Sequence, residues 1–165
     1  MSGLGRSNGP FLLNAMVPRD LVSLPADGSG ADLIFAVAGT RDGRDAVVVV
    51  SITVTPFDPP PGVAAHEVLA AMLRSRAPEK SGLVEEFTTP AGCPAVGIRR
   101  AATQEIGGRP VTSGQAQALV VYREPGALGV VSGACRRAAD LDTTAVLVAG
   151  IAARMTVTAG GLSRG

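Results

Sequence analysis

Hydrophobic residues in this chain recur mainly in short extended runs separated by turn-forming residues. Two such runs, Leu33–Ala38 and Ala46–Thr55, flank the Asp42-Gly43 step. An Asp-Gly step between apolar runs is a strong signal for a β-hairpin. The first half of the second run is apolar on both faces, which predicts a central strand covered on both sides. Its two faces carry Val48, Val50, Ile52 and Val54, and Val47, Val49, Ser51 and Thr53.

Further runs alternate or are rich in residues that favour strands. Glu124-Pro125-Gly126 separates two of them by a short turn, so we expect those two to form a hairpin. Consecutive hairpins make a sheet mainly antiparallel. The additional predicted strands are Phe11–Val17, Leu21–Leu24, Leu83–Thr88, Ala95–Ile106, Gln115–Arg123, Leu128–Cys135 and Thr156–Thr158.

Two segments have the periodicity of amphipathic helices instead. The first spans about Val63–Arg76, after the proline-rich residues 56–62 and before Pro78. Its apolar stripe is Val68, Leu69, Met72 and Leu73. The second runs from about Asp140, which with Asp142 is a candidate N-cap, to Met155. Its stripe is Leu147, Val148, Ile151 and Met155.

This order of segments predicts an α+β fold. We expect a mainly antiparallel sheet of six to seven strands packed with two helices. The 165 residues fit one domain, which we place at residues 11–158. Residues 1–10 and 159–165 are rich in small residues and are predicted to be flexible tails.

Composition and charge exclude several classes of function. The formal net charge is +1, from 15 basic and 14 acidic residues, so no strong field would attract a phosphate backbone and we expect no nucleic-acid partner. No apolar run reaches the ~20 residues that span a bilayer. The Gly/Ser-rich start does not resemble a secretory signal, so we expect no membrane insertion and a cytoplasmic protein.

The sequence holds little that resembles catalytic chemistry. His66 is the only histidine, and we interpret it as a surface helix residue. Ser113 and Ser132 lie in no nucleophile elbow. Glu85 and Glu86 are adjacent on a predicted strand, so they face opposite ways and cannot act as a pair. No motif predicts a metal ion, a nucleotide or another cofactor, and we expect no enzyme.

The chain has two cysteines, Cys93 and Cys135. Without an export signal, free thiols are favoured over the single disulfide that two cysteines could form. Arg136 and Arg137 follow Cys135 and could lower the pKa of its thiol, but a small apolar packing role is the simpler interpretation.

One basic area is a candidate for partner binding. Arg99 and Arg100, together with Arg109, could gather near one end of the sheet and receive an acidic partner segment or a phosphate. Arg136 and Arg137 could add to it. The alternative is a solvated rim that contributes little.

The order of segments resembles a known group of folds. The segments that match occur in the same order as in that group. They are the hairpin Leu33–Thr55, a proline-rich break, the helix from Val63, the meander Leu83–Cys135 and the closing segment Ala138–Val157. The arrangement is similar to the α/β/α sandwich of PsbP-like photosystem proteins, DcrB-like proteins and actinobacterial LpqN-like lipoproteins. The resemblance covers about Leu21–Thr158 and rests on pattern, because the group has no universal catalytic motif.

The resemblance implies a class of function. Members are mostly non-catalytic: they assist assembly of larger complexes or bind a partner protein, and the related Eag chaperones hold apolar helices before export. We therefore predict a protein-binding accessory factor, chaperone or adaptor linked to secretion or assembly, with a homodimer as a related expectation. The alternatives are a small-ligand binding domain with a cavity between sheet and helix, a structural subunit of a larger particle, and an unrecognised enzyme.

Overall fold

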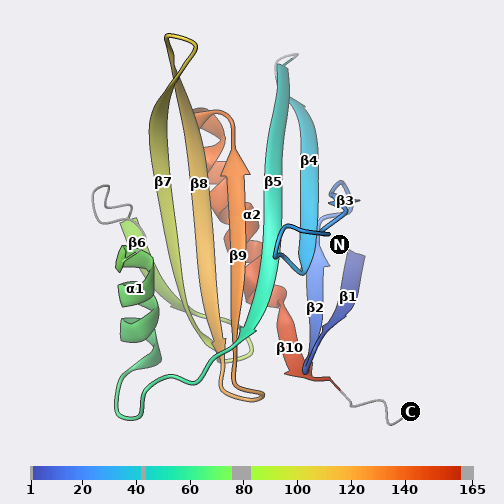
Figure 1. Ribbon diagram of the computed structural model, residues 1–165, viewed down its shortest axis with the longest axis vertical. Coiled ribbons are helices and arrows are strands. Elements are labelled where there is room, and N and C mark those ends of the chain that lie inside the picture. Colours follow the sequence, from blue (N-terminus) through green and yellow to red (C-terminus); the bar gives the residue numbers. More distant parts are fainter. Residues whose placement is uncertain (1, 42–43, 76–82, 161–165) are drawn as a thin grey trace.

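The computed structural model describes residues 2–41, 44–75 and 83–160 (Figure 1). These residues form ten strands, two α-helices and one 3-10 turn. The elements are β1 Ser2–Asn8, β2 Phe11–Val17, β3 Val22–Leu24, β4 Leu33–Arg41, β5 Arg44–Pro56, α1 Ala65–Ser75, β6 Leu83–Thr88, β7 Pro94–Ile106, β8 Arg109–Tyr122, β9 Ala127–Cys135, the 3-10 turn Ala138–Asp140, α2 Leu141–Arg154 and β10 Thr156–Ala159.

Seven strands form the main sheet in the order β3-β4-β5-β9-β8-β7-β6. Every neighbouring pair is antiparallel. The predicted hairpins around residues 42–43 and at the Glu124-Pro125-Gly126 turn are both present, as β4–β5 and β8–β9. The predicted α+β class, with a mainly antiparallel sheet and two helices, is therefore confirmed.

A second sheet, of order β1-β2-β10, was not predicted. The expectation of a loose tail over residues 1–10 is wrong for Ser2–Asn8, which pair along the whole of β2. The alternation of Phe11–Val17 explains why: its odd residues are buried in the core and its flanks are left free to pair with a strand on each side. Of the expected C-terminal tail, Ala159 ends β10, whereas residues 161–165 lie outside the described part of the chain.

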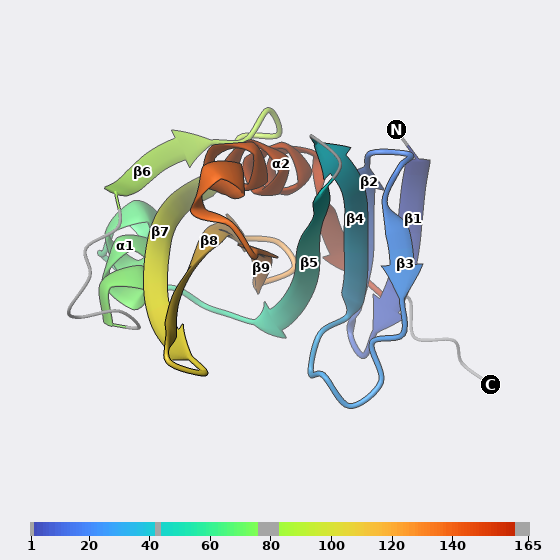
Figure 2. The same ribbon diagram turned by 90° about the horizontal axis from the view of Figure 1, so that it is seen from above.

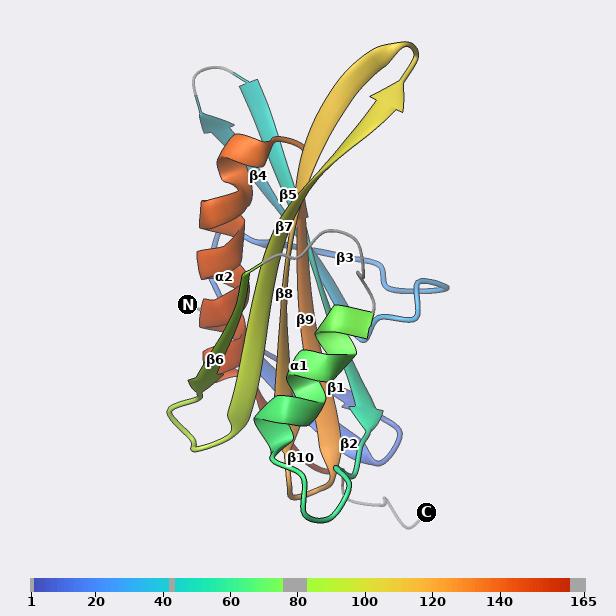
Figure 3. The same ribbon diagram turned by 90° about the vertical axis from the view of Figure 1, so that its left-hand side faces the viewer.

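The two helices lie on opposite faces of the main sheet (Figures 2 and 3). On one face, α2 and the inner side of the small sheet share a core with the main sheet. On the other face, α1 packs mainly on β7. The alternation of each strand divides the side chains between these cores, which include Val50, Ala118 and Val120 on the α2 side and Val96, Leu119 and Val121 on the α1 side.

Coverage of β5 differs from the prediction. One face of β5 is buried in the core that α2 covers, as expected from the shared face of Val48, Val50, Ile52 and Val54. Val49 faces the other way and its side chain is 38% exposed. α1 contacts β7 and β6, at the opposite end of the sheet from β4 and β5, so this part of its face stays open. The expectation that β5 is covered on both sides is therefore wrong.

Candidate functional site

A groove of about 330 Å³ opens between α2 and the edge strand β6. Its floor is formed by β7 and β8, and its walls by β6 and the outer side of α2. Most of its lining is apolar. Figure 2 shows that α2 lies beside the edge strand β6, the two elements that form these walls.

The groove is deep because the side chains that form its floor are small. Gly97 of β7 lies opposite Ala118 of β8, and Ala116 is two residues further along the same face. A Cβ atom added at Gly97 would lie 3.8 Å from both the Gln117 carbonyl oxygen and Cε1 of Phe87, so a methyl group would fit there in ordinary van der Waals contact. Larger side chains at these three positions would fill the groove.

The two walls differ in chemistry. On β6, Glu85 pairs with Gly97 and Phe87 with Ala95, so both side chains share the face of the floor. On α2, the wall consists of Ala145, Val146 and Ala149, which helical spacing places on one side of the helix. The side chain of Val146 is 74% exposed. The groove therefore has an apolar helical wall facing a strand that carries a carboxylate and an aromatic ring.

An ion pair closes one end of the groove. Nη1 of Arg99, on β7, lies 2.7 Å from Oδ1 of Asp142, in the first turn of α2. Both side chains are accessible to solvent, at 43% and 84% exposure, so this pair contributes little to stability. Its geometric consequence is that the Arg99 guanidinium is held toward α2 at this end of the groove.

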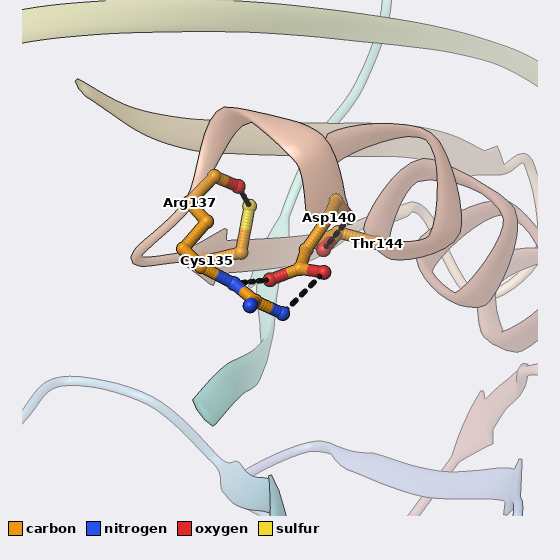
Figure 4. A network of polar contacts seen from close by, with 4 residues as sticks. All are labelled: Cys135, Arg137, Asp140 and Thr144. Carbon is orange, nitrogen blue, oxygen red and sulfur yellow. Dashed lines mark hydrogen bonds and ion pairs between the residues drawn. The ribbon is translucent and has the colours of Figure 1, made fainter. Parts of the chain in front are cut away.

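A buried polar network fixes the start of α2 (Figure 4). The Arg137 guanidinium donates to both carboxylate oxygens of Asp140, at 2.8 and 3.1 Å, and the Thr144 hydroxyl donates to the Asp140 carbonyl oxygen. The Cys135 thiol donates to the Arg137 carbonyl oxygen. The Asp140 carboxylate is thus held by Arg137 and makes no hydrogen bond to the helix N-terminus, contrary to the capping role that the sequence suggested.

Close packing holds the same helix against the sheet. Gly133 of β9 lies directly beneath α2: a Cβ atom added there would be 2.7 Å from Cγ2 of Val148 and 2.8 Å from Cγ2 of Thr144. Only glycine permits this approach of helix and strand. The α2 wall of the groove is therefore set by the sheet beneath it.

The three arginines predicted as one basic area do not gather on one face. Arg99 faces α2 through its ion pair with Asp142, whereas the neighbouring Arg100 points to the other face, where it donates two hydrogen bonds to Oε1 of Gln115. Arg109 lies at the tip of the β7–β8 hairpin, paired with Ile106 and about 20 Å along the strand from Gln115. A partner-binding role for each arginine stays a prediction.

The remaining reactive residues have structural surroundings. Nε2 of His66 lies 3.0 Å from the Phe87 carbonyl oxygen and links α1 to β6. Cys93 and Cys135 are free, in agreement with the sequence interpretation, and Cys135 is buried.

The Tyr122 hydroxyl donates a hydrogen bond to the Met155 carbonyl oxygen. Burial of Tyr122, and to a smaller extent the charge of Cys93, raises the pKa of Tyr122 well above 10. Among the described residues, no group of histidine, cysteine and carboxylate side chains is placed to hold a metal ion.

Sequence reasoning allowed for a cavity between sheet and helix but did not identify the residues that line this groove. Its floor residues are separated by about 20 positions along the chain and come together only through the pairing of β7 with β8. Two signals were present in the sequence: small residues at alternate positions of neighbouring strands, and the apolar residues Ala145, Val146 and Ala149 outside the main stripe of the second helix. Neither indicates a hollow until the strand register is known.

The fold has known counterparts, although no family model and no curated protein matches the chain. LpqN, involved in cell envelope biogenesis of Mycobacterium tuberculosis, superposes with a TM-score of 0.59 at 16% identity, over 95% of this chain and 90% of that chain. The Ran-binding protein Mog1p of Saccharomyces cerevisiae gives 0.54 at 12% identity, over 94% and 95%. A Mog1 mutant gives 0.54 at 13% identity, over 98% and 99%.

These identities show a shared fold and no more. The predicted resemblance to LpqN-like proteins is thereby confirmed at the level of the fold. No described helix is both long and apolar enough to cross a membrane.

Proposed function

We propose that this protein is a non-enzymatic accessory factor that binds a segment of a partner protein in the groove between α2 and β6. The observation that carries this proposal is the groove itself: an apolar hollow of about 330 Å³ whose floor of glycine and alanine leaves room for side chains from outside. Burying one or two aliphatic side chains there would contribute about 1.5–3 kcal/mol each.

The fold neighbours support a role in protein binding. One of them is described as Ran-binding and another as involved in cell envelope biogenesis, and the present chain could act likewise as an accessory protein. A chaperone or adaptor role in secretion or complex assembly, a homodimeric state and a cytoplasmic location are finer predictions of the same proposal.

A small apolar ligand is the second candidate, because the groove lies between sheet and helix and its volume is at the lower end of typical ligand sites. Native mass spectrometry of the purified protein separates the two candidates. A retained small mass that is lost on substitution of the groove floor would favour the ligand.

The proposal is tested by selecting binders from a phage-displayed random peptide library. Gly97→Val fills the floor, and valine suits a strand position. Ala134→Val is the matched control, because Ala134 is exposed on β9 and pairs with Val49 and Gln115 on the face that α2 does not cover. Equal urea midpoints of the two variants would show that each is folded.

We expect peptides that bind the wild-type protein and the Ala134→Val variant but lose at least tenfold in affinity for the Gly97→Val variant. Peptides that bind all three proteins alike, or a library that yields no binder, would contradict the proposal.

A further inference from the structure

The charges around the groove are unbalanced. The rim carries two carboxylates, from Glu85 and Asp142, and the guanidinium of Arg99. Asp142 and Arg99 neutralise each other through their ion pair. Glu85 is exposed and forms no ion pair with any described residue, whereas Glu86 pairs with Val96 and leaves β6 on the opposite face. The groove therefore presents one uncompensated negative charge, that of Glu85, beside its apolar lining.

Glu85 is the carboxylate best placed to contact an occupant. It pairs with Gly97 across the ladder, so its side chain leaves β6 on the same face as the groove floor. A cationic side chain next to an apolar one would bring these two features together: the apolar group would rest on Gly97 and Ala118, and the cation would meet Glu85.

Resting on the proposed function, we infer that the groove binds a protein segment in which a lysine or arginine directly adjoins its apolar residues. The charge complementarity selects this occupant over an acidic or an entirely apolar segment. Glu85 supplies the selectivity, and the Gly97 floor supplies the apolar contact.

Arg99 controls how much negative charge the occupant meets. On β7 it lies two residues from Gly97 on the groove face, diagonal to Glu85 and within reach of a long side chain. In the structure it is held by Asp142 at 2.7 Å instead. Arg99 thus offsets part of the negative charge of the rim without occupying Glu85.

The inference is tested on the peptides selected above, by titrating them against three proteins: wild type, the Glu85→Gln variant and the Arg99→Gln variant. Binding is measured by fluorescence anisotropy at about 50 mM and about 300 mM NaCl. The higher salt concentration should weaken an ionic contact, because it screens the charges more strongly. Urea unfolding of each variant checks that the fold is kept.

We expect a lysine or arginine beside the apolar residues of the selected peptides. Glu85→Gln should weaken binding about three- to tenfold, and Arg99→Gln should strengthen it by about threefold, because the rim becomes more negative. These opposite signs would not arise from a general loss of structure.

Groove-dependent peptides that lack a basic residue, or whose affinity is unchanged in the Glu85→Gln variant, would overturn this inference and leave the proposed function standing. Peptides whose affinity is unchanged in the Gly97→Val variant, or the absence of any binder, would overturn both the inference and the proposed function.

Discussion

His66 of α1 and Phe87 of β6 are joined by a hydrogen bond: Nε2 of the imidazole lies 3.0 Å from the Phe87 carbonyl oxygen. β6 is an edge strand of the main sheet and, within the described part of the chain, pairs with β7 alone. Phe87 also lines the groove on the opposite face. The helix on one side of the sheet therefore helps to hold a wall of the groove on the other side.

Replacing His66 by Ala should loosen β6. Loss of one partly buried hydrogen bond should lower the free energy of unfolding by about 1 kcal/mol. Hydrogen exchange followed by mass spectrometry should show faster exchange in Leu83–Thr88 than in wild type, with little change in β9. His66→Gln, which keeps a side-chain donor, is the control, and its stability and exchange rate in β6 should lie between those of wild type and the alanine variant. Unchanged exchange in β6 of the alanine variant would show that the contact does not hold the strand.

Gly133 and Gly97 should respond oppositely to the same change. Gly133→Ala forces a methyl group against Val148 and Thr144, two β-branched side chains beneath α2, and should cost about 1–3 kcal/mol. Gly97→Ala meets nothing closer than 3.8 Å and should be neutral or stabilising by about 0.5 kcal/mol. Urea unfolding of the two variants measures both values. Equal stabilities would mean that α2 does not pack as closely on β9 as described.

The main sheet and both helices were predictable because short segments of the sequence carry the patterns that indicate them. The Asp42-Gly43 step and the Pro125-Gly126 turn mark hairpins, and the stripe of Leu69 and Leu73 marks a helix. The strand β1 was not predictable in the same way. Glycines and serines give it no hydrophobic alternation, and it is ordered by pairing with β2.

The site depended on information that one segment does not contain. Adjacent arginines on a strand must face opposite ways, so Arg99 and Arg100 could have been separated by periodicity alone. The ion pair of Arg99 with Asp142, by contrast, joins residues 43 positions apart and follows from the packing of α2 on the sheet. The groove arises from the same long-range packing, which is why its residues were not predicted.

The two thiols should react very differently with Ellman's reagent. Both are free, but Cys135 is buried and donates to the Arg137 carbonyl oxygen, whereas Cys93 is partly exposed in the turn before β7. We expect one thiol to react in the native protein and the second only after unfolding in urea. Cys93→Ser should abolish the native reaction, and Cys135→Ser should leave it unchanged. Two reactive thiols in the folded protein would contradict the burial of Cys135.

Tyr122 should make the stability of the protein depend on alkaline pH. Burial, and secondarily the charge of Cys93, raises the pKa of Tyr122 above its ordinary value of 10.0. Its hydroxyl is protonated in both states well below pH 10, so its contribution is fully present there. Above pH 10 the unfolded chain releases the proton while the folded protein retains it, so the free energy of unfolding falls as pH rises.

Tyr122→Phe separates this effect from other titrating groups. The substitution removes the hydrogen bond to the Met155 carbonyl oxygen and should cost about 1 kcal/mol at neutral pH. The variant should also lose less stability than wild type between about pH 9 and pH 11, because a phenyl ring has no proton to release. Urea unfolding of both proteins across this range gives the comparison. Parallel pH profiles would show that the Tyr122 hydroxyl is not shielded from solvent as its surroundings require.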